Sequence, residues 1–144
     1  MIASLRILLL AALLAAAGPW IHGAAADDEL YRSFGGRDVI TKIVDDATDR
    51  WVADERIKDT FDNINLVRFK RLLTDQICEL TGGPFQYKGR NMYESHKGLH
   101  LNQKEFNALV EGLQEAMDKY KIPFWTQNRL IVLLAPMERD IVTR

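Results

Sequence analysis

Cysteine and one-sided charge are both scarce in this 144-residue sequence, and each scarcity excludes a class of protein. Cys78 is the only cysteine, so neither an internal disulfide nor a cysteine-based zinc site can form. Because the thiol falls at an apolar helical position, we expect it to be buried and inert; pairing with a cysteine of another molecule is the alternative. The formal net charge is −1, and the lysine and arginine residues are scattered among acids. This distribution argues against nucleic acid as a partner.

Long apolar runs are absent beyond the first residues of the chain. Residues 1–6 carry one positive charge, 7–17 are almost all apolar, and 18–26 end in three alanines. This order is typical of a secretory signal peptide, and we expect cleavage after one of those alanines. The apolar core of about 11 residues is shorter than the ~20 that a spanning helix needs; an uncleaved anchor is the alternative. We therefore expect a signal peptide at 1–26, export to the periplasm, and no membrane attachment after cleavage.

Repeats, low-complexity tracts and proline-rich linkers are also missing, so residues 27–144 are expected to form a single domain. No segment alternates between apolar and polar residues for long enough to predict a β-strand. Apolar residues instead recur at helical spacing over 38–51, 66–80, 106–120 and 124–141. The predicted fold class is all-α, with four substantial helices and several short ones.

The expected helix ends carry residues that begin or stop helices. Asn102 and Glu105 form the pattern of an N-cap with its acidic partner three residues on. The sequence Gly82-Gly83-Pro84 should stop the second long helix. Pro136 should kink or interrupt the last helix, because it cannot donate a backbone hydrogen bond.

One histidine stands where it can reach a flat cofactor. His22 lies in the expected signal peptide, whereas His96 ends a glycine-punctuated loop, 81–99, between two apolar helices. Neutral imidazole is the usual protein ligand of haem iron. Phe61 and Phe69 supply flat aromatic surface of the kind that a dry haem slot needs.

Two other interpretations compete with a haem site. His100 follows His96 by four residues, so the pair could share one face of a continuous helix as metal ligands, although Gly98 between them weakens this. Alternatively, the same apolar residues form an ordinary helical-bundle core, and His96 is only a satisfied polar residue.

From Leu30 to about Val142 the sequence resembles the truncated haemoglobins of the first group. The resemblance rests on landmarks that follow one another at the family's spacing. They are Leu30-Tyr31 with Gly35-Gly36, Val52-Ala53-Asp54, Phe61, Gly82-Gly83-Pro84, the run Tyr87-x-Gly89-Arg90-x-Met92-x-x-x-His96-x-x-Leu99, Ile122-Pro123 and Ala135-Pro136.

The resemblance implies a shortened globin, with helices stacked two over two around haem and a mostly non-helical segment before the iron ligand. It places His96 at the ligand to the iron and Phe61 against the haem face, whereas His100 matches no ligand position. The expected haem-binding residues are Phe61, Phe69, Leu73, Lys88, Met92 and His96. The propionate groups of haem need cations, for which the candidates are Lys88, Arg90 and Arg71.

The gas-binding, or distal, side departs from the family. Its expected residues are Ala47, Thr48, Phe69, Leu73 and Gln76. Relatives usually carry phenylalanine and tyrosine at the positions of Ala47 and Thr48, and often glutamine at Leu73. The usual hydrogen-bond network is therefore missing, because a helical threonine often bonds its own preceding turn. Gln76 is the one amide side chain in this set that could point toward the bound gas.

These expectations define one principal function and two alternatives. The principal one is an exported haem protein that reversibly binds a diatomic gas through penta-coordinate iron, with oxygen as the default and nitric oxide or carbon monoxide as other ligands. The first alternative is a haem enzyme that oxidises nitric oxide or reduces peroxide, served by an unidentified reductase. The second is a haem-free helical interaction module on the same scaffold.

Overall fold

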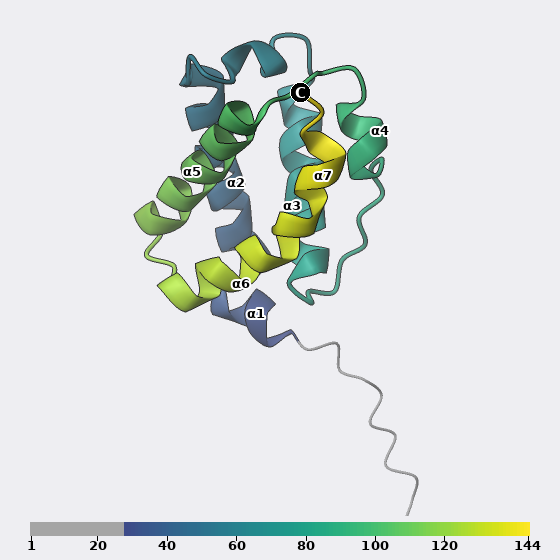
Figure 1. Ribbon diagram of the computed structural model, residues 1–144. Coiled ribbons are helices and arrows are strands. Elements are labelled where there is room, and N and C mark those ends of the chain that lie inside the picture. The colour runs from purple at the N-terminus through teal and green to yellow at the C-terminus, as the bar shows by residue number, and fades with distance from the viewer. Residues whose placement is uncertain (1–27) are drawn as a thin grey trace, which may run out of the picture.

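The structure is a computed structural model that describes residues 28–144 (Figure 1), so the expected signal peptide lies outside the described residues. Within that range nearly all regular structure is helical, and the all-α prediction is confirmed; one isolated bridge pairs Leu101 with Val142. None of the helices in this range is long and apolar enough to cross a membrane. The elements are α1 (Glu29–Ser33), α2 (Gly36–Ala53), the 3-10 turn η1 (Lys58–Phe61), α3 (Leu66–Leu80), α4 (Met92–His96), α5 (Gln103–Lys119), α6 (Phe124–Leu134), the 3-10 turn η2 (Ala135–Met137) and α7 (Glu138–Ile141).

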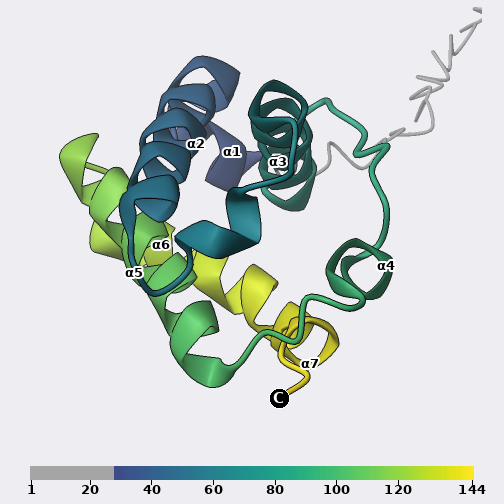
Figure 2. The same ribbon diagram turned by 90° about the horizontal axis from the view of Figure 1, so that it is seen from above.

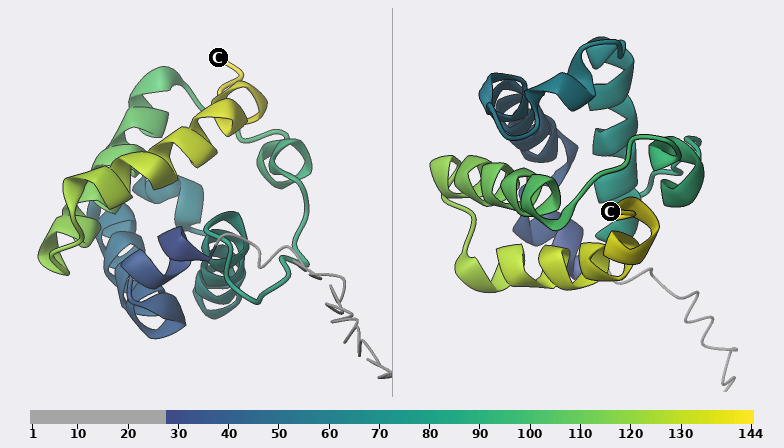
Figure 3. Two further views of the ribbon diagram at one scale, coloured as in Figure 1. Left: turned by 90° about the horizontal axis from the view of Figure 1, so that it is seen from below. Right: turned by 45° about the horizontal axis from the view of Figure 1, so that its top comes forward.

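Helix α2 is the centre of the packing. It lies against both α3 and α5, while α1 bridges α2 and α6 (Figure 2). The short helix α4 packs on α7 instead, on the side of the molecule away from α2, as Figures 2 and 3 show. The fold therefore places α4, which carries His96, on the far side of the molecule from α2, with α7 beside it.

The buried face of α2 agrees with the predicted apolar stripe. Ile40, Ile43, Val44, Ala47 and Trp51 are all buried, at the three- and four-residue spacing of one helical face. The helix begins two residues earlier than the sequence predicted. Gly35 makes this possible because its φ of +87° lies in the left-handed region, which favours glycine.

The capping signals read from the sequence are present. The Asn102 side chain accepts hydrogen bonds from the backbone N–H groups of Lys104 and Glu105, and the Glu105 carboxylate accepts one from the Asn102 N–H at 2.7 Å. Helix α3 stops as expected at the glycine pair, where Gly82 has a φ of +89° and the Gly83 N–H bonds the Cys78 carbonyl. These bonds fix the start of α5 and the end of α3, the two helices that flank the His96 loop.

Pro136 interrupts the last predicted helix. Regular α-helix ends at Leu134, a 3-10 turn spans the proline, and only four residues of α7 follow. A proline ring clashes with the carbonyl four residues earlier and lacks the N–H that an α-helix needs. Beyond this interruption, α7 packs against α4.

The single cysteine is buried, as the sequence predicted. Burial raises the pKa of the Cys78 thiol to about 11, so it stays protonated at neutral pH. An inert thiol follows from that protonation, since the thiolate is the reactive form.

An ion-pair cluster fastens α2 to α5. Asp46 accepts hydrogen bonds from Arg50 at 2.7 Å and from Lys119, and Arg50 also contacts Glu115 at 2.5 Å. Burial alone would raise the pKa of Asp46, but the hydrogen bonds from Lys119 and Arg50 outweigh it and hold that pKa below its usual value.

Replacing Asp46 with asparagine should lower the free energy of unfolding at pH 7 by about 1 kcal/mol, the upper end for solvent-screened pairs. Because the folded pKa is depressed, this stabilisation is complete above the unfolded value of about 3.9 and is lost as pH falls through the folded value. Urea titrations from pH 7 to pH 2.5 measure it. Asp49→Asn, at an exposed partner of Lys70, is the matched control and should change stability less. A difference between Asp46→Asn and the unmodified protein that persists unchanged at the lowest pH would contradict this assignment.

Candidate haem site

The imidazole of His96 is oriented by its own short helix. The Asn91 side chain caps the start of α4 by accepting a hydrogen bond from the Glu94 N–H at 2.8 Å, and His96 is the last residue of that helix. Its Nδ1 lies 2.7 Å from the Met92 carbonyl oxygen, so Nδ1 carries the proton and donates it. Nε2 has no hydrogen-bond partner among residues 28–144. A histidine that donates from Nδ1 to a backbone carbonyl and keeps the Nε2 lone pair free is in the tautomer that ligates a metal.

His100 does not share a helical face with His96. Helix α4 ends at His96, and His100 is exposed on irregular backbone with a φ of +51°. The two-histidine interpretation, which needed one continuous helix, is therefore wrong. In the described part of the chain no three histidine, cysteine, aspartate or glutamate side chains gather to hold a metal ion.

Helix α3 carries large apolar side chains that the protein only partly covers. Leu66, Phe69, Leu72 and Leu73 are half-buried, in contrast to the fully buried stripe of α2, although Ile77 further along is buried. Phe61 is buried, and its ring centroid lies 5.6 Å from that of Phe69 in an edge-to-face arrangement. Half-covered apolar side chains of this kind fit the face of a flat, largely apolar group such as haem.

The two candidate polar groups on the gas side are both engaged elsewhere. The Thr48 hydroxyl is fully buried and donates to the Val44 carbonyl at 2.7 Å, the preceding-turn bond that the sequence led us to expect. Gln76 Nε2 contacts two sulfur atoms instead, Met92 Sδ at 3.7 Å and Met137 Sδ at 4.0 Å. Ala47 beside Thr48 is fully buried and adds no polar atom.

The Gln76 contacts connect three separate elements. They join α3 to α4 through Met92 and to the turn before α7 through Met137, and so tie the His96 helix to the rest of the fold. Met137 lies within the predicted helical range 124–141, whose apolar spacing gives it no role at the site. Only the tertiary structure brings it to Gln76, 61 residues away.

The cations considered for the propionates are exposed. No ion pair within residues 28–144 involves Lys88, Arg90 or Arg71, so each can bind an anion from solvent. Lys88 and Arg90 lie in the irregular segment before α4, and Arg71 lies on the outer side of α3. Their roles stay predictions.

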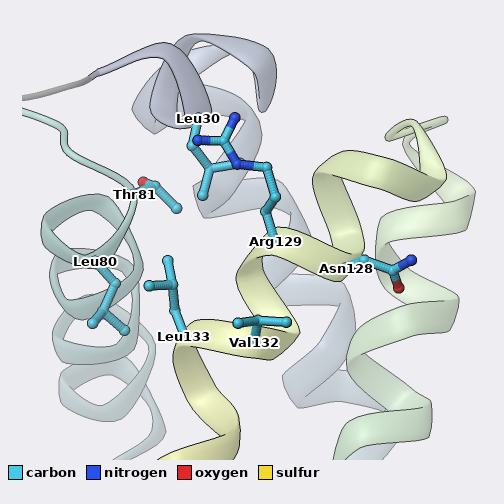
Figure 4. Close-up of a pocket in the computed structure, with 7 residues that line it drawn as sticks. All are labelled: Leu30, Leu80, Thr81, Asn128, Arg129, Val132 and Leu133. Atoms are coloured by element: carbon cyan, nitrogen blue, oxygen red, sulfur yellow. The ribbon is translucent and has the colours of Figure 1, made fainter.

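A cavity of about 400 Å³ opens at another part of the molecule, where α1 and α6 meet the end of α3 (Figure 4). Its lining consists of Leu30, Leu80, Thr81, Asn128, Arg129, Val132 and Leu133. None of the expected haem or gas-side residues belongs to this set. The expected haem-binding and gas-side residues therefore lie outside this cavity.

The family of the chain follows from comparison with known proteins. The sequence model of the bacterial-like globins matches residues 29–143. This chain belongs to that family. A group 1 truncated haemoglobin from Tetrahymena pyriformis is 29% identical over 113 residues, which are 78% of this chain and 93% of the relative. One from Nostoc commune is 33% identical over 88 residues, covering 61% of this chain and 75% of the relative.

Solved structures agree with the sequence comparison. The Fe(III) form of the Tetrahymena pyriformis truncated haemoglobin superposes with a TM-score of 0.77 at 29% identity, covering 80% of this chain and 98% of that one. The expected two-over-two globin fold and the group 1 truncated haemoglobin family are both confirmed. Since globins are haem proteins, the expected cofactor is confirmed at the level of the family. The role of each site residue, His96 included, remains a prediction.

Proposed function

We propose that this globin is an exported haem protein that reversibly binds a diatomic gas, with oxygen as the default ligand and His96 as the only protein ligand to the iron. Haem supplies a ferrous centre with one open position for a small gas. The observation that carries the proposal is the unpaired Nε2 of His96, held in the metal-ligating tautomer by the Met92 carbonyl.

The protein's own residues would hold the cofactor from both sides. Met92 and His96 lie on the iron-ligand side, while Phe61, Phe69 and Leu73 offer the apolar surface against which the ring would pack. An apolar slot excludes water, which favours retention of a hydrophobic macrocycle. Lys88, an exposed cation in the segment that leads to α4, is the propionate partner that we propose.

A mostly apolar gas side supports simple binding over turnover. The Thr48 hydroxyl donates its hydrogen bond to the Val44 carbonyl, and the Gln76 amide contacts two sulfur atoms. Neither group therefore donates toward a bound ligand. Oxidation of nitric oxide and reduction of peroxide both depend on polar groups that stabilise developing charge. We therefore favour reversible binding over the enzymatic alternative.

An absorption spectrum tests this proposal directly. Purified protein titrated with haemin should develop a Soret band that saturates at one haem per protein chain. On reduction it should give the spectrum of a ferrous haem with a single protein ligand. Carbon monoxide should then shift the band. A protein that takes up no haem would instead support the haem-free interaction module, and a reduced spectrum with two protein ligands would contradict penta-coordination.

Export is a separate prediction, motivated by the charged start, the apolar run and the three alanines of residues 1–26. We expect the mature protein to begin near Ala25 to Asp27 and to be recovered from the periplasm. N-terminal sequencing of protein from the native host measures this. Recovery of intact Met1 in a cytoplasmic fraction would rule out a cleaved, exported form.

A further inference from the structure

Three aromatic rings from three elements meet beside the expected gas side. Trp51 at the end of α2 stacks on Phe61 of η1, with ring centroids 6.1 Å apart and planes 12° apart. The same indole meets Phe69 of α3 edge-on at 6.3 Å, and Phe61 and Phe69 meet edge-on at 5.6 Å. Each ring therefore touches the other two. The apolar spacing over 38–51 predicts only that Trp51, its last residue, lies on a buried helical face.

The indole of Trp51 is fixed from the opposite side by α5. Its Nε1–H donates to the Leu109 carbonyl at 2.9 Å, and the side chain is only 2% exposed. Gly112, one turn further along α5, leaves room for the ring. A Cβ at that position would lie 2.6 Å from Nε1 and 2.8 Å from Cδ1 of Trp51, closer than such atoms approach in proteins. The hydrogen bond to Leu109 and the packing against Gly112 together restrain the position of the indole.

We infer that Trp51 is a positioning residue for gas binding, which sets the orientation of the Phe61 and Phe69 rings and through them the shape of the gas-side wall. This inference rests on the proposed function, because it assigns those two phenylalanines to the haem site. A phenyl ring turns about its last torsion with little intrinsic preference, so its neighbours decide where it rests. Here the neighbour is an indole that is itself held by α5.

A core-filling role would give a different pattern of effects. Truncating a side chain that only fills core volume lowers the free energy of unfolding. It does not change the orientation of the neighbouring rings, because other core residues set that orientation. A positioning role predicts that small changes at Trp51 or Gly112 alter the mobility of the two phenylalanine rings and the gas kinetics.

The test uses two variants that disturb the indole in different ways. Trp51→Phe keeps an aromatic ring but removes the N–H group, and Gly112→Ala keeps the indole but displaces it. Trp125→Phe makes the same chemical change at a tryptophan that is 50% exposed on α6, and is the matched control. Ring-flip rates of labelled phenylalanines are measured by NMR in the diamagnetic ferrous carbon monoxide form.

Both variants should flip the Phe61 and Phe69 rings faster than the unmodified protein, with Phe106 of α5 unchanged. Carbon monoxide association should change by about 2- to 12-fold, the equivalent of the 0.5–1.5 kcal/mol of an aromatic pair at 1.4 kcal/mol per decade. Trp125→Phe should change neither. The Trp51→Phe variant should be closer to the unmodified protein than Trp51→Leu, because a ring partly restores the stacking.

Unchanged ring flips and gas kinetics in both variants, with only a lower unfolding temperature, would overturn the positioning role and leave haem binding intact. If the unmodified protein takes up no haem, the proposed function fails and the gas-side role fails with it. Ring flips can then be measured in the haem-free protein, where unaltered rates in Gly112→Ala would also reject positioning itself.

Discussion

Replacing His96 with alanine should abolish stable haem uptake, or leave a pigment without the ferrous spectrum of the unmodified protein. In the proposed site the imidazole contributes the only coordinate bond between the protein and the iron. Its Nε2 atom has no hydrogen-bond partner among the described residues. Loss of that bond leaves only apolar packing to retain the cofactor. The measurement is a haemin titration followed through the Soret band, in both oxidation states.

His100→Ala is the matched control for this experiment. It removes the same side chain four residues away, from an exposed position with left-handed backbone. Haem uptake should be unchanged in this variant. Free imidazole added to His96→Ala should restore part of the spectrum, since it can occupy the volume that the side chain left. Loss of haem binding in His100→Ala but not in His96→Ala would show that the register of the site is wrong.

A related prediction concerns the orientation of the His96 imidazole ring. The Met92 carbonyl fixes the Nδ1 proton, and Asn91 fixes the turn that carries this carbonyl. Asn91→Ala should therefore weaken haem retention without removing the ligand, because replacing an N-cap by alanine costs about 1 kcal/mol. Haem transfer to an acceptor protein measures the rate of loss. Equal rates in Asn91→Ala and the unmodified protein would show that the cap does not contribute to the site.

Much of the fold could be predicted because local chemistry decides it. The stripe of α2, the capping pair Asn102 and Glu105, the glycine stop after α3 and the break at Pro136 are each specified within a few residues. The early start of α2 was missed because Gly35 acts through a left-handed φ that spacing alone does not reveal. The helical turn of α4 was not predicted, since it contains no residue that is buried.

The candidate site was harder to predict where contacts join distant segments. The spacing of Gln76 suggested that its amide could point toward the gas side. The amide instead contacts Met92 and Met137, and no local sequence pattern predicts these contacts. The Trp51 hydrogen bond to Leu109 spans 58 residues and depends on Gly112 being small. Sequence periodicity places such residues on a buried face, whereas the partner on that face depends on how the helices cross.

Oxygen should leave this globin quickly, and Thr48→Tyr should slow its release by about 10- to 150-fold. The oxygen ligand is more polar than carbon monoxide, so a hydrogen-bond donor beside it stabilises oxygen much more. A hydrogen bond to a charged group contributes roughly 1.5–3 kcal/mol, which at 1.4 kcal/mol per decade gives that range. In the unmodified protein the Thr48 hydroxyl bonds the Val44 carbonyl and cannot serve as this donor. Stopped-flow dissociation rates for oxygen and carbon monoxide measure the effect.

Two matched variants separate the effect of the hydroxyl from that of the ring. Thr48→Phe adds the same ring without a donor and should not slow oxygen release, although both rings need the space beside Ala47. Thr48→Val removes the native hydroxyl and should leave both dissociation rates nearly unchanged, because that hydroxyl is committed to its own helix. Carbon monoxide release should change little in Thr48→Tyr. Slow oxygen release in the unmodified protein that is lost in Gln76→Leu would instead make Gln76 the donor, which would require its amide to leave the two sulfur atoms it contacts.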